Sequence, residues 1–189
     1  MTRDRGRYAV LIVMIMMVII PYKVIYAQNP IETPTVDVPA DSMTILRGED
    51  YMLHLLDSVK KAKQRIWIAT YSITGPRSNR MTYFYKKLEN KYDSGVDVKL
   101  LITGKLDRNK KIIQKLRKKF DFDMKLYEGD NLFHGKFIVI DQNKVYNGSA
   151  NLTLTAFNRP YETSIFVEDQ SLTRTFAHLM KRVWNKEDN

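Results

Sequence analysis

The sequence predicts an α/β protein in which a layered, mixed β-sheet is flanked by helices. From about residue 42 onward, short runs rich in β-branched and aromatic residues alternate with amphipathic segments of about ten to fifteen residues. Such alternation is typical of a sheet that is partly parallel. The 189 residues include 44% apolar and 28% charged residues, a composition that is ordinary for a globular domain with its own core.

The helices and strands are expected to follow one another from Ser42. Apolar residues at helical spacing predict helices over 49–63, 81–92, 109–120 and 171–184. Runs of β-branched and aromatic residues predict strands over 65–74, 96–103, 124–127 and 162–167. A further strand pair is expected over 133–141 and 145–146, with a turn over 142–144. Both tryptophans, Trp67 and Trp184, are expected in the core.

Residues 1–27 predict an export or anchor segment. Three arginines precede an apolar run over 8–20, and a small residue follows at Ala27. The run is shorter than the roughly 20 residues that a membrane-spanning helix needs. These features indicate either a signal peptide cleaved after Ala27 or an uncleaved anchor in the inner membrane formed by residues 8–27. In both cases we expect the body outside the cytoplasm, in the periplasm or secreted, because the basic residues keep the N-terminus inside.

A linker is expected between this segment and the folded body. Residues 28–41 contain three spaced prolines and few large apolar groups, which favours an extended spacer and leaves 42–189 as the domain. The formal net charge of the chain is +10. Such an excess favours a polyanionic partner, either nucleic acid or an anionic membrane surface. Because the chain has no cysteine, disulfides, thiolate metal sites and a cysteine nucleophile are excluded.

Most of the chemical information lies in one stretch that runs from His134 to Asn151. On the predicted strand, His134 and Lys136 project from the same face, roughly 6.5–7 Å apart along the chain. An imidazole and an ammonium at that spacing can contact one phosphate, the first as a nucleophile and the second by stabilising charge on phosphoryl oxygens. Gly148 and Ser149 would bring backbone N–H and hydroxyl donors to the same anion, and Asn151 adds a side-chain amide.

These residues resemble the signature of the phospholipase D superfamily, H-x-K-x(4)-D followed by G-S-x-N. The chain contains HGKFIVID over 134–141 and GSAN over 148–151, in the same order. The resemblance covers about residues 42–184 and is closest to the small bacterial endonucleases that carry one motif per chain. It implies that 42–189 is a catalytic domain with one half of a phospholipase D-like fold.

The resemblance also implies a role for each matching residue. His134 would be the nucleophile that forms a phosphohistidine. Lys136 and Asn151 would hold the phosphoryl oxygens, assisted by Ser149. Glu162, which follows Tyr161 in a segment similar to a later strand of the family, would orient an active-site histidine by hydrogen bonding.

Asp141 completes the motif and is counted with the catalytic set, although its position indicates a different role. It lies an odd number of residues from His134 and Lys136, so a regular strand would turn it to the opposite face. We therefore expect Asp141 to be structural, for example by pairing with a basic group.

Members of this family need two such motifs in one active site, because one histidine attacks while the other protonates the leaving oxygen. Neither His54 nor His178 is part of a second motif, and both are expected to be helix-face residues. The resemblance therefore implies that two chains pair about a two-fold axis as a homodimer and share the site. Covalent catalysis of this kind uses no metal and no other cofactor, and the sequence has no cluster of metal-ligating residues.

A basic stretch from Lys105 to Lys119 is a second candidate for contact with a polyanion. It holds eight lysines and arginines against one acid, Asp107. A solvated helix face and a surface that follows a nucleic-acid backbone are equally supported interpretations. On the second interpretation Lys105, Lys110 and Lys111 bind the substrate.

The leading hypothesis is a metal-independent phosphodiesterase that acts as a non-specific endonuclease on DNA or RNA. The alternative is a phospholipid phosphodiesterase held at a membrane surface by the N-terminal segment, since the same motif serves both substrates. A third hypothesis is a non-catalytic binder of nucleic acid. The intact His134, Lys136 and Asn151 count against it, because a pure binder has no need of a nucleophile.

Overall fold

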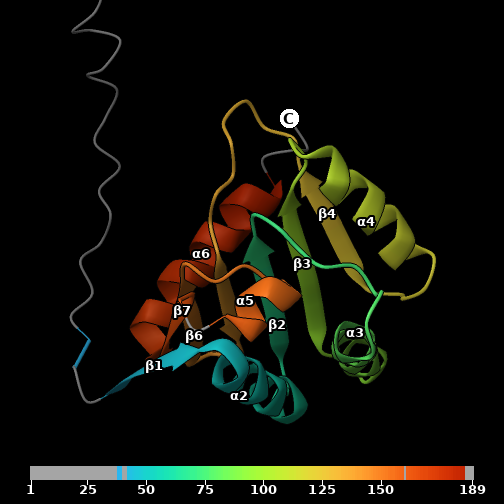
Figure 1. Cartoon of the computed structure of the whole chain (residues 1–189). Helices are drawn as coiled ribbons and strands as arrows, with labels where there is room; N and C mark the ends of the chain where they lie inside the picture. The colour runs from blue at the N-terminus through green and yellow to red at the C-terminus, as the bar shows by residue number, and fades with distance from the viewer. Residues whose placement is uncertain (1–37, 40–41, 160, 186–189) are drawn as a thin grey trace, which may run out of the picture. The chain divides into compact units, whose positions relative to one another are not determined.

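The strands of the protein form one mixed sheet, and helices lie on both of its faces (Figure 1). The computed structural model describes residues 38–39, 42–159 and 161–185. The expected leader over 1–27 lies outside the described residues, and so does the linker over 28–41 except for residues 38–39. The strands are β1 (Met43–Arg47), β2 (Arg65–Thr70), β3 (Asp97–Thr103), β4 (Asp123–Tyr127), β5 (Phe137–Ile140), β6 (Lys144–Gly148) and β7 (Thr163–Glu168). The helices are α2 (Gly48–Lys61), α3 (Asn79–Asp93), α4 (Asp107–Arg117), α5 (Leu154–Asn158) and α6 (Gln170–Asn185).

The sheet has a parallel part and an antiparallel part, and its order is β1-β7-β6-β5-β2-β3-β4. β2, β3 and β4 run parallel, because α3 and α4 connect them as helical crossovers. β5, β6, β7 and β1 pair antiparallel, and β5 joins the two parts by pairing with β2. The predicted mixed, partly parallel sheet is therefore confirmed. No helix in the described ranges is long and apolar enough to cross a membrane.

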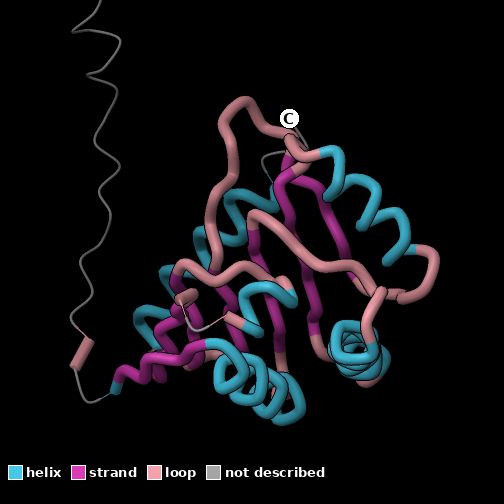
Figure 2. The backbone as a smooth tube through the Cα atoms, viewed as in Figure 1, coloured by secondary structure: helices cyan, strands magenta, loops and turns pink. Residues whose placement is uncertain are grey.

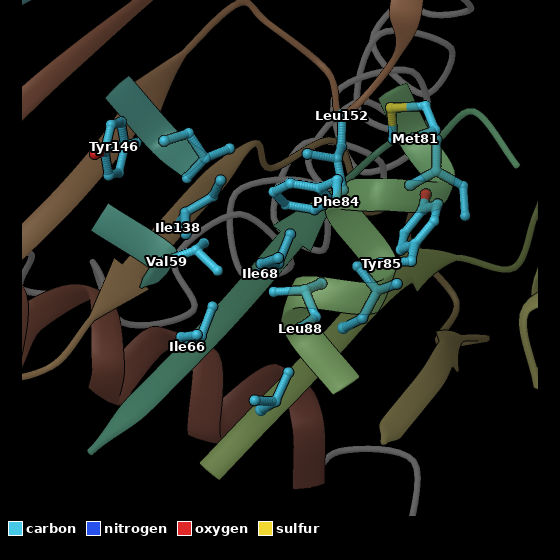
Figure 3. Close-up of a cluster of buried hydrophobic side chains, with 14 of the residues drawn as sticks. Val59, Ile66, Ile68, Met81, Phe84, Tyr85, Leu88, Ile138, Tyr146 and Leu152 are labelled. Carbon is cyan, nitrogen blue, oxygen red and sulfur yellow. The ribbon is translucent and has the colours of Figure 1, made fainter. Parts of the chain in front are cut away.

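The core is divided between the two faces of the sheet. α2, α3, α4 and α5 pack on one face, whereas α6 crosses the other (Figure 1). Figure 3 shows side chains from α2, β2 and α3 meeting on the first face. Val59, Ile66, Ile68, Phe84 and Leu88 are all fully buried there. Burying each such side chain is worth about 1.5–3 kcal/mol, so β2 is a firmly held strand on which a site can be built.

Local sequence sets where two of the helices begin and end. Ser78 caps α3, because its hydroxyl accepts a hydrogen bond from the N–H of Met81 at 3.2 Å. The chain leaves α3 through Gly95, whose φ of +86° is one that glycine adopts without strain. Thr153 caps the short helix α5 in the same way, by accepting from the N–H of Ala156 at 3.1 Å. Because each cap joins residues three positions apart, the local sequence fixes where α3 and α5 begin.

The prediction over 133–141 is wrong in its first four residues, because β5 begins only at Phe137. Another segment takes the place beside the end of β2. The N–H of Thr74 donates to the carbonyl of Leu152 at 3.0 Å, and Ile73 bridges Leu152 in parallel. Residues 128–136 instead form a long loop between β4 and β5, at the top of the view in Figure 2. β2 also ends at Thr70, earlier than expected, and neither β1 nor α5 was predicted.

Candidate active site

The imidazole of His134 and the ammonium of Lys136 lie together just before β5 begins. Nζ of Lys136 is 3.3 Å from Nδ1 of His134 and 3.4 Å from its Nε2, and it donates to the carbonyl of His134 at 2.9 Å. The expected position of both groups on one face of a strand does not hold, because residues 134–136 precede β5, yet the two side chains still meet. Because His134 is exposed and Lys136 half-buried, a ligand that arrives from solvent meets both.

Tyr71 holds this pair from the end of β2. Its ring meets the imidazole of His134 edge-on, with the ring centroids 4.6 Å apart and an interplanar angle of 61°. Nζ of Lys136 lies 5.4 Å from the centroid of the same ring, within the range of a cation–π contact. Tyr71 was not among the predicted site residues, because the predicted strand over 65–74 included it; only the end of β2 at Thr70 places it at a strand terminus.

The charge on Lys136 depends on its surroundings. Burial lowers the pKa of the Lys136 ammonium, and the negative charge of Glu162 acts in the opposite direction. Glu162 lies directly before β7 and is half-buried. Among the described residues it forms no hydrogen bond to His134, so the expected orientation of a histidine by Glu162 does not take place within this chain. Its interaction here is with Lys136, whose charged form it stabilises.

Ser149 ties the end of β6 to the start of β7. Its hydroxyl accepts from the N–H of Thr163 at 3.0 Å, and its own N–H donates to the Thr163 carbonyl at 2.9 Å. The N–H of Gly148 donates to the carbonyl of Lys136 at 3.4 Å. A Cβ atom at Gly148 would lie 2.2 Å from the Thr163 carbonyl oxygen, so the close approach requires glycine. The backbone N–H groups expected to face the anion are thus used inside the protein, and Gly148 and Ser149 position Lys136 and Glu162.

Asn151 connects the site to the segment that follows β2. Its Oδ1 accepts from the N–H of Ser72 at 3.1 Å, which leaves the amide Nδ2 as a donor for a ligand. Nη2 of Arg108 donates to the hydroxyl of Ser72 at 2.9 Å. The buried Asn109 donates to the carbonyls of Tyr71 and Thr103, at 2.8 and 3.0 Å. The first turn of α4 is therefore fastened to the segment that follows β2.

Arg108 is the residue of the basic stretch that reaches this segment. Lys105, Lys110 and Lys111, which were predicted to bind substrate, are exposed beside it. Arg108 was one of the eight basic residues of the stretch but was not singled out, because the predicted helix began at residue 109. α4 begins at Asp107, which puts Arg108 in its first turn, where the backbone carries a partial positive charge that favours anions. Arg108 adds a full positive charge at that end of α4.

Asp141 lies at the other end of β5, away from His134. Its carboxylate accepts hydrogen bonds at 2.7–3.2 Å from the N–H groups of Lys63, Gln64 and Arg65, which precede or begin β2. Its φ is +52°, in the left-handed region that Asp tolerates better than most residues. These contacts agree with the expected structural role of Asp141, although its partners are three backbone N–H groups in place of the basic group given as an example.

The two other histidines lie elsewhere. His54 is on α2, where its Nδ1 is 2.8 Å from the hydroxyl of Tyr146 and burial lowers its pKa. His178 is exposed on α6. The described residues thus bring one imidazole to the site. In the same part of the chain, no three histidine, aspartate or glutamate side chains are grouped so that they could hold a metal ion.

Known proteins are similar to this chain in sequence and in fold. The family profile described as "Cardiolipin synthase, PLD-like domain" matches residues 55–184. A "Phospholipase D" of Rickettsia conorii is 29% identical over 124 residues, which are 65% of this chain and 58% of that protein. A "Phospholipase D" of Rickettsia typhi is 28% identical over 65% of this chain and 57% of its own length. The chain therefore spans less than two thirds of the length of these relatives.

Two solved structures share the fold. Nuc from Salmonella typhimurium, a phospholipase D family member, has a TM-score of 0.61 at 21% identity, over 76% of this chain and 95% of that chain. NucT from Helicobacter pylori has a TM-score of 0.60 at 17% identity, over the same shares of the two chains. The profile match includes all of the residues from His134 to Glu162. This chain belongs to the family of phospholipase D-like domains.

Proposed function

We propose that the protein is a metal-independent phosphodiesterase that cleaves the backbone of DNA or RNA through a phosphohistidine. One observation carries the proposal. An exposed imidazole, that of His134, lies 3.3 Å from the half-buried ammonium of Lys136, in a setting where one phosphate can contact both. The amide of Asn151, fixed at the end of β2 by Ser72, is the third group for the same phosphate.

The geometry supports a two-step displacement. In the first step a nitrogen of neutral His134 attacks phosphorus, and the P–N bond forms as the P–O bond to one ester breaks. Lys136 and Asn151 stabilise the charge that develops on the phosphoryl oxygens. In the second step water attacks phosphorus, gives its proton to the group that protonated the first leaving oxygen, and breaks the P–N bond, which releases the phosphomonoester and restores His134. The leaving oxygen of the first step needs a proton donor.

We propose that this proton comes from His134 of a second chain, in a homodimer whose two-fold axis passes through the site. The support is that the described residues bring one imidazole to the site while the mechanism needs two. In this arrangement Glu162 is available to the histidine of the second chain, because it makes no hydrogen bond to His134 of its own. Sedimentation of the active protein tests the pairing. A fully active monomer would contradict it.

Nucleic acid is the favoured substrate because of charge. The chain carries a formal +10, and Arg108 brings one of these charges to the segment beside the site. A phosphate backbone of regular negative charges complements such a surface. Phospholipid is the second candidate, and the relatives named "Phospholipase D" in two Rickettsia species favour it. With a leader over 1–27, we further propose that the domain acts outside the cytoplasm.

The test is digestion of plasmid DNA, RNA and a single-stranded oligonucleotide by the purified chain in excess chelator, beside His134→Ala. We expect the parent to cut, more slowly as salt rises, and the variant to fall to background. Anionic phospholipid vesicles are incubated in parallel. Head-group release without cleavage of DNA or RNA would move the assignment to phospholipid. Binding of nucleic acid that His134→Ala leaves intact, with no product from either protein, would indicate a binder.

A further inference from the structure

A second site lies at the opposite end of β2 from His134, on the face of the sheet that α6 crosses. Here a cleft of about 620 Å³ opens between the first residues of β2 and β3 and the last turns of α6. Its volume is within the range of about 300–1,000 Å³ that is usual for ligand pockets. The residues that matter are Arg65, Trp67, Asp97, Lys99, Lys181 and Trp184.

Three cations converge on one indole ring in this cleft. The charged groups of Arg65, Lys99 and Lys181 lie 4.9, 5.1 and 6.0 Å from the centroid of Trp67. Among the described residues that line the cleft, Asp97 is the carboxylate; it pairs with Lys99 and accepts the indole N–H of Trp67 at 2.9 Å. Within residues 42–159 and 161–185, one carboxylate against three cations leaves a positive charge beside the aromatic rings, where electrostatic interactions are stronger than in open water. An anion would relieve the mutual repulsion of the cations.

The second tryptophan adds a flat surface to the anion site. Trp184 was expected in the core together with Trp67. Trp67 is 5% exposed and confirms that expectation, whereas Trp184 is only half-buried and lines the cleft. Lys99 lies 5.8 Å from the centroid of the Trp184 ring. A partly open indole beside clustered cations suits a ligand that combines a phosphate with a flat ring. A strand of nucleotides is such a ligand, since bases stack on aromatic side chains while cations hold the backbone.

We propose that this cleft binds single-stranded nucleic acid at a distance from the His134 site. The inference rests on the proposed function and specifies its substrate as a strand that contacts the protein twice. Arg65 in the cleft precedes Tyr71, which contacts His134, by six residues, and at about 3.3 Å per residue these two positions are about 20 Å apart. A strand of several nucleotides can reach both sites, so its second contact is intramolecular and strengthens binding. A phospholipid head group has no flat ring to place on Trp184.

The protein carries its own reporter for this test. Its two tryptophans both line the cleft, so the tryptophan component of the intrinsic fluorescence reports on this cleft. The full chain with His134→Ala, which leaves the strand uncut, is titrated with oligothymidylates of about 4 and about 16 nucleotides. We expect saturable quenching by both, with a Kd at least about tenfold lower for the longer strand.

Two variants in the same background identify the groups that bind. Lys181→Glu is expected to raise the Kd for the longer strand about tenfold and to reduce the slope of log Kd against log salt by about one. The matched control is Lys60→Glu, an equal charge reversal on an exposed residue of α2, on the other face of the sheet. Trp184→Leu keeps Trp67 as the reporter. It is expected to weaken binding of oligothymidylate about tenfold and to leave binding of an abasic strand of equal length nearly unchanged.

The outcomes separate this inference from the proposed function. Cleavage by the parent protein without a change in tryptophan fluorescence would overturn the second site alone. Quenching without cleavage would support the second site and contradict the nuclease. Equal Kd values for Lys181→Glu and Lys60→Glu would overturn the inference, as would quenching by anionic vesicles but not by oligothymidylate.

Discussion

Just before β5, outside the sheet, the side chains of His134 and Lys136 contact each other and can be reached from solvent. Just after β5, the carboxylate of Asp141 accepts hydrogen bonds from the backbone at the start of β2. The two ends belong to one sequence motif and lie four strand residues apart. Lys136 is held where burial lowers the pKa of its ammonium, whereas the carboxylate of Asp141 accepts three backbone N–H groups. The two ends thus differ in what their polar groups contact: Lys136 and His134 contact mainly each other and Tyr71 beside solvent, whereas the Asp141 carboxylate is occupied by backbone donors.

Among the substitutions that test this contrast, Lys136→Met should have the largest effect on activity. The variant should lose about 10³-fold in kcat/KM, since it removes the group that stabilises charge on the phosphoryl oxygens. Its free energy of unfolding should stay unchanged or rise, because a half-buried ammonium is replaced by an apolar chain of similar length. Rates and denaturant unfolding are measured on one preparation. A loss of more than about 1 kcal/mol of stability would show that Lys136 is structural.

Asp141→Asn should lower stability and leave activity nearly unchanged, the reverse of Lys136→Met. Asparagine tolerates the φ of +52° but accepts hydrogen bonds without a negative charge, so the free energy of unfolding should fall by about 2 kcal/mol. Cleavage per folded molecule should stay within about threefold of the parent, because His134 lies at the other end of the strand. Asp141→Ala, which also loses the left-handed preference, should cost more. If Asp141→Asn removed activity at full stability, the two ends of β5 would not be separable.

Glu162→Gln tests the electrostatic interaction between Glu162 and the ammonium of Lys136. Burial lowers the pKa of Lys136 and the charge of Glu162 raises it, so loss of that charge should lower the pKa further. The ammonium would then deprotonate at a lower pH. The alkaline limb of the rate–pH profile should move to lower pH, with about tenfold less activity on that limb. Glu168→Gln, at the other end of β7, is the matched control. An unmoved alkaline limb in Glu162→Gln would contradict the coupling.

Arg108→Ala should have the smallest effect, because Arg108 contacts the site through Ser72. We expect KM for nucleic acid to rise about three- to fivefold, kcat to change less, and the slope of log KM against log salt to decrease by about one. Lys115→Ala, an exposed residue of the same helix, controls for the general loss of charge. Equal effects of the two substitutions would mean that α4 contributes only its overall field.

Local patterns predicted most of the fold. The period of apolar residues predicted the four longer helices, and runs of β-branched residues predicted the strands of the parallel part. They failed at β1, where Ile45 is 69% exposed and buries little, and at α5, which is five residues long. Neither element has enough buried positions to show a period. Their places depend on neighbours that are distant in sequence, since β1 pairs with β7.

The sequence by itself determined that an imidazole, an ammonium and an amide occur at fixed spacing, in His134, Lys136 and Asn151, and the proposed function rests on these groups. That position 148 requires glycine follows from the structure, because a Cβ there would lie 2.2 Å from the carbonyl oxygen of Thr163. Only the tertiary structure decided that Leu152 pairs with Ile73 and Thr74 after the end of β2, and that His134 and Lys136 lie outside the sheet.

The tertiary structure likewise decided the partners of the site. Tyr71 reaches His134 across a gap of 63 residues, and Arg108 reaches Ser72 across 36. The cleft at the other end of β2 brings Trp67 and Trp184 together over a still longer separation. The chemistry of a side chain follows from the identity of its residue. Proximity between residues that are distant in sequence arises from the packing of whole helices and strands, which no local pattern in the chain specifies.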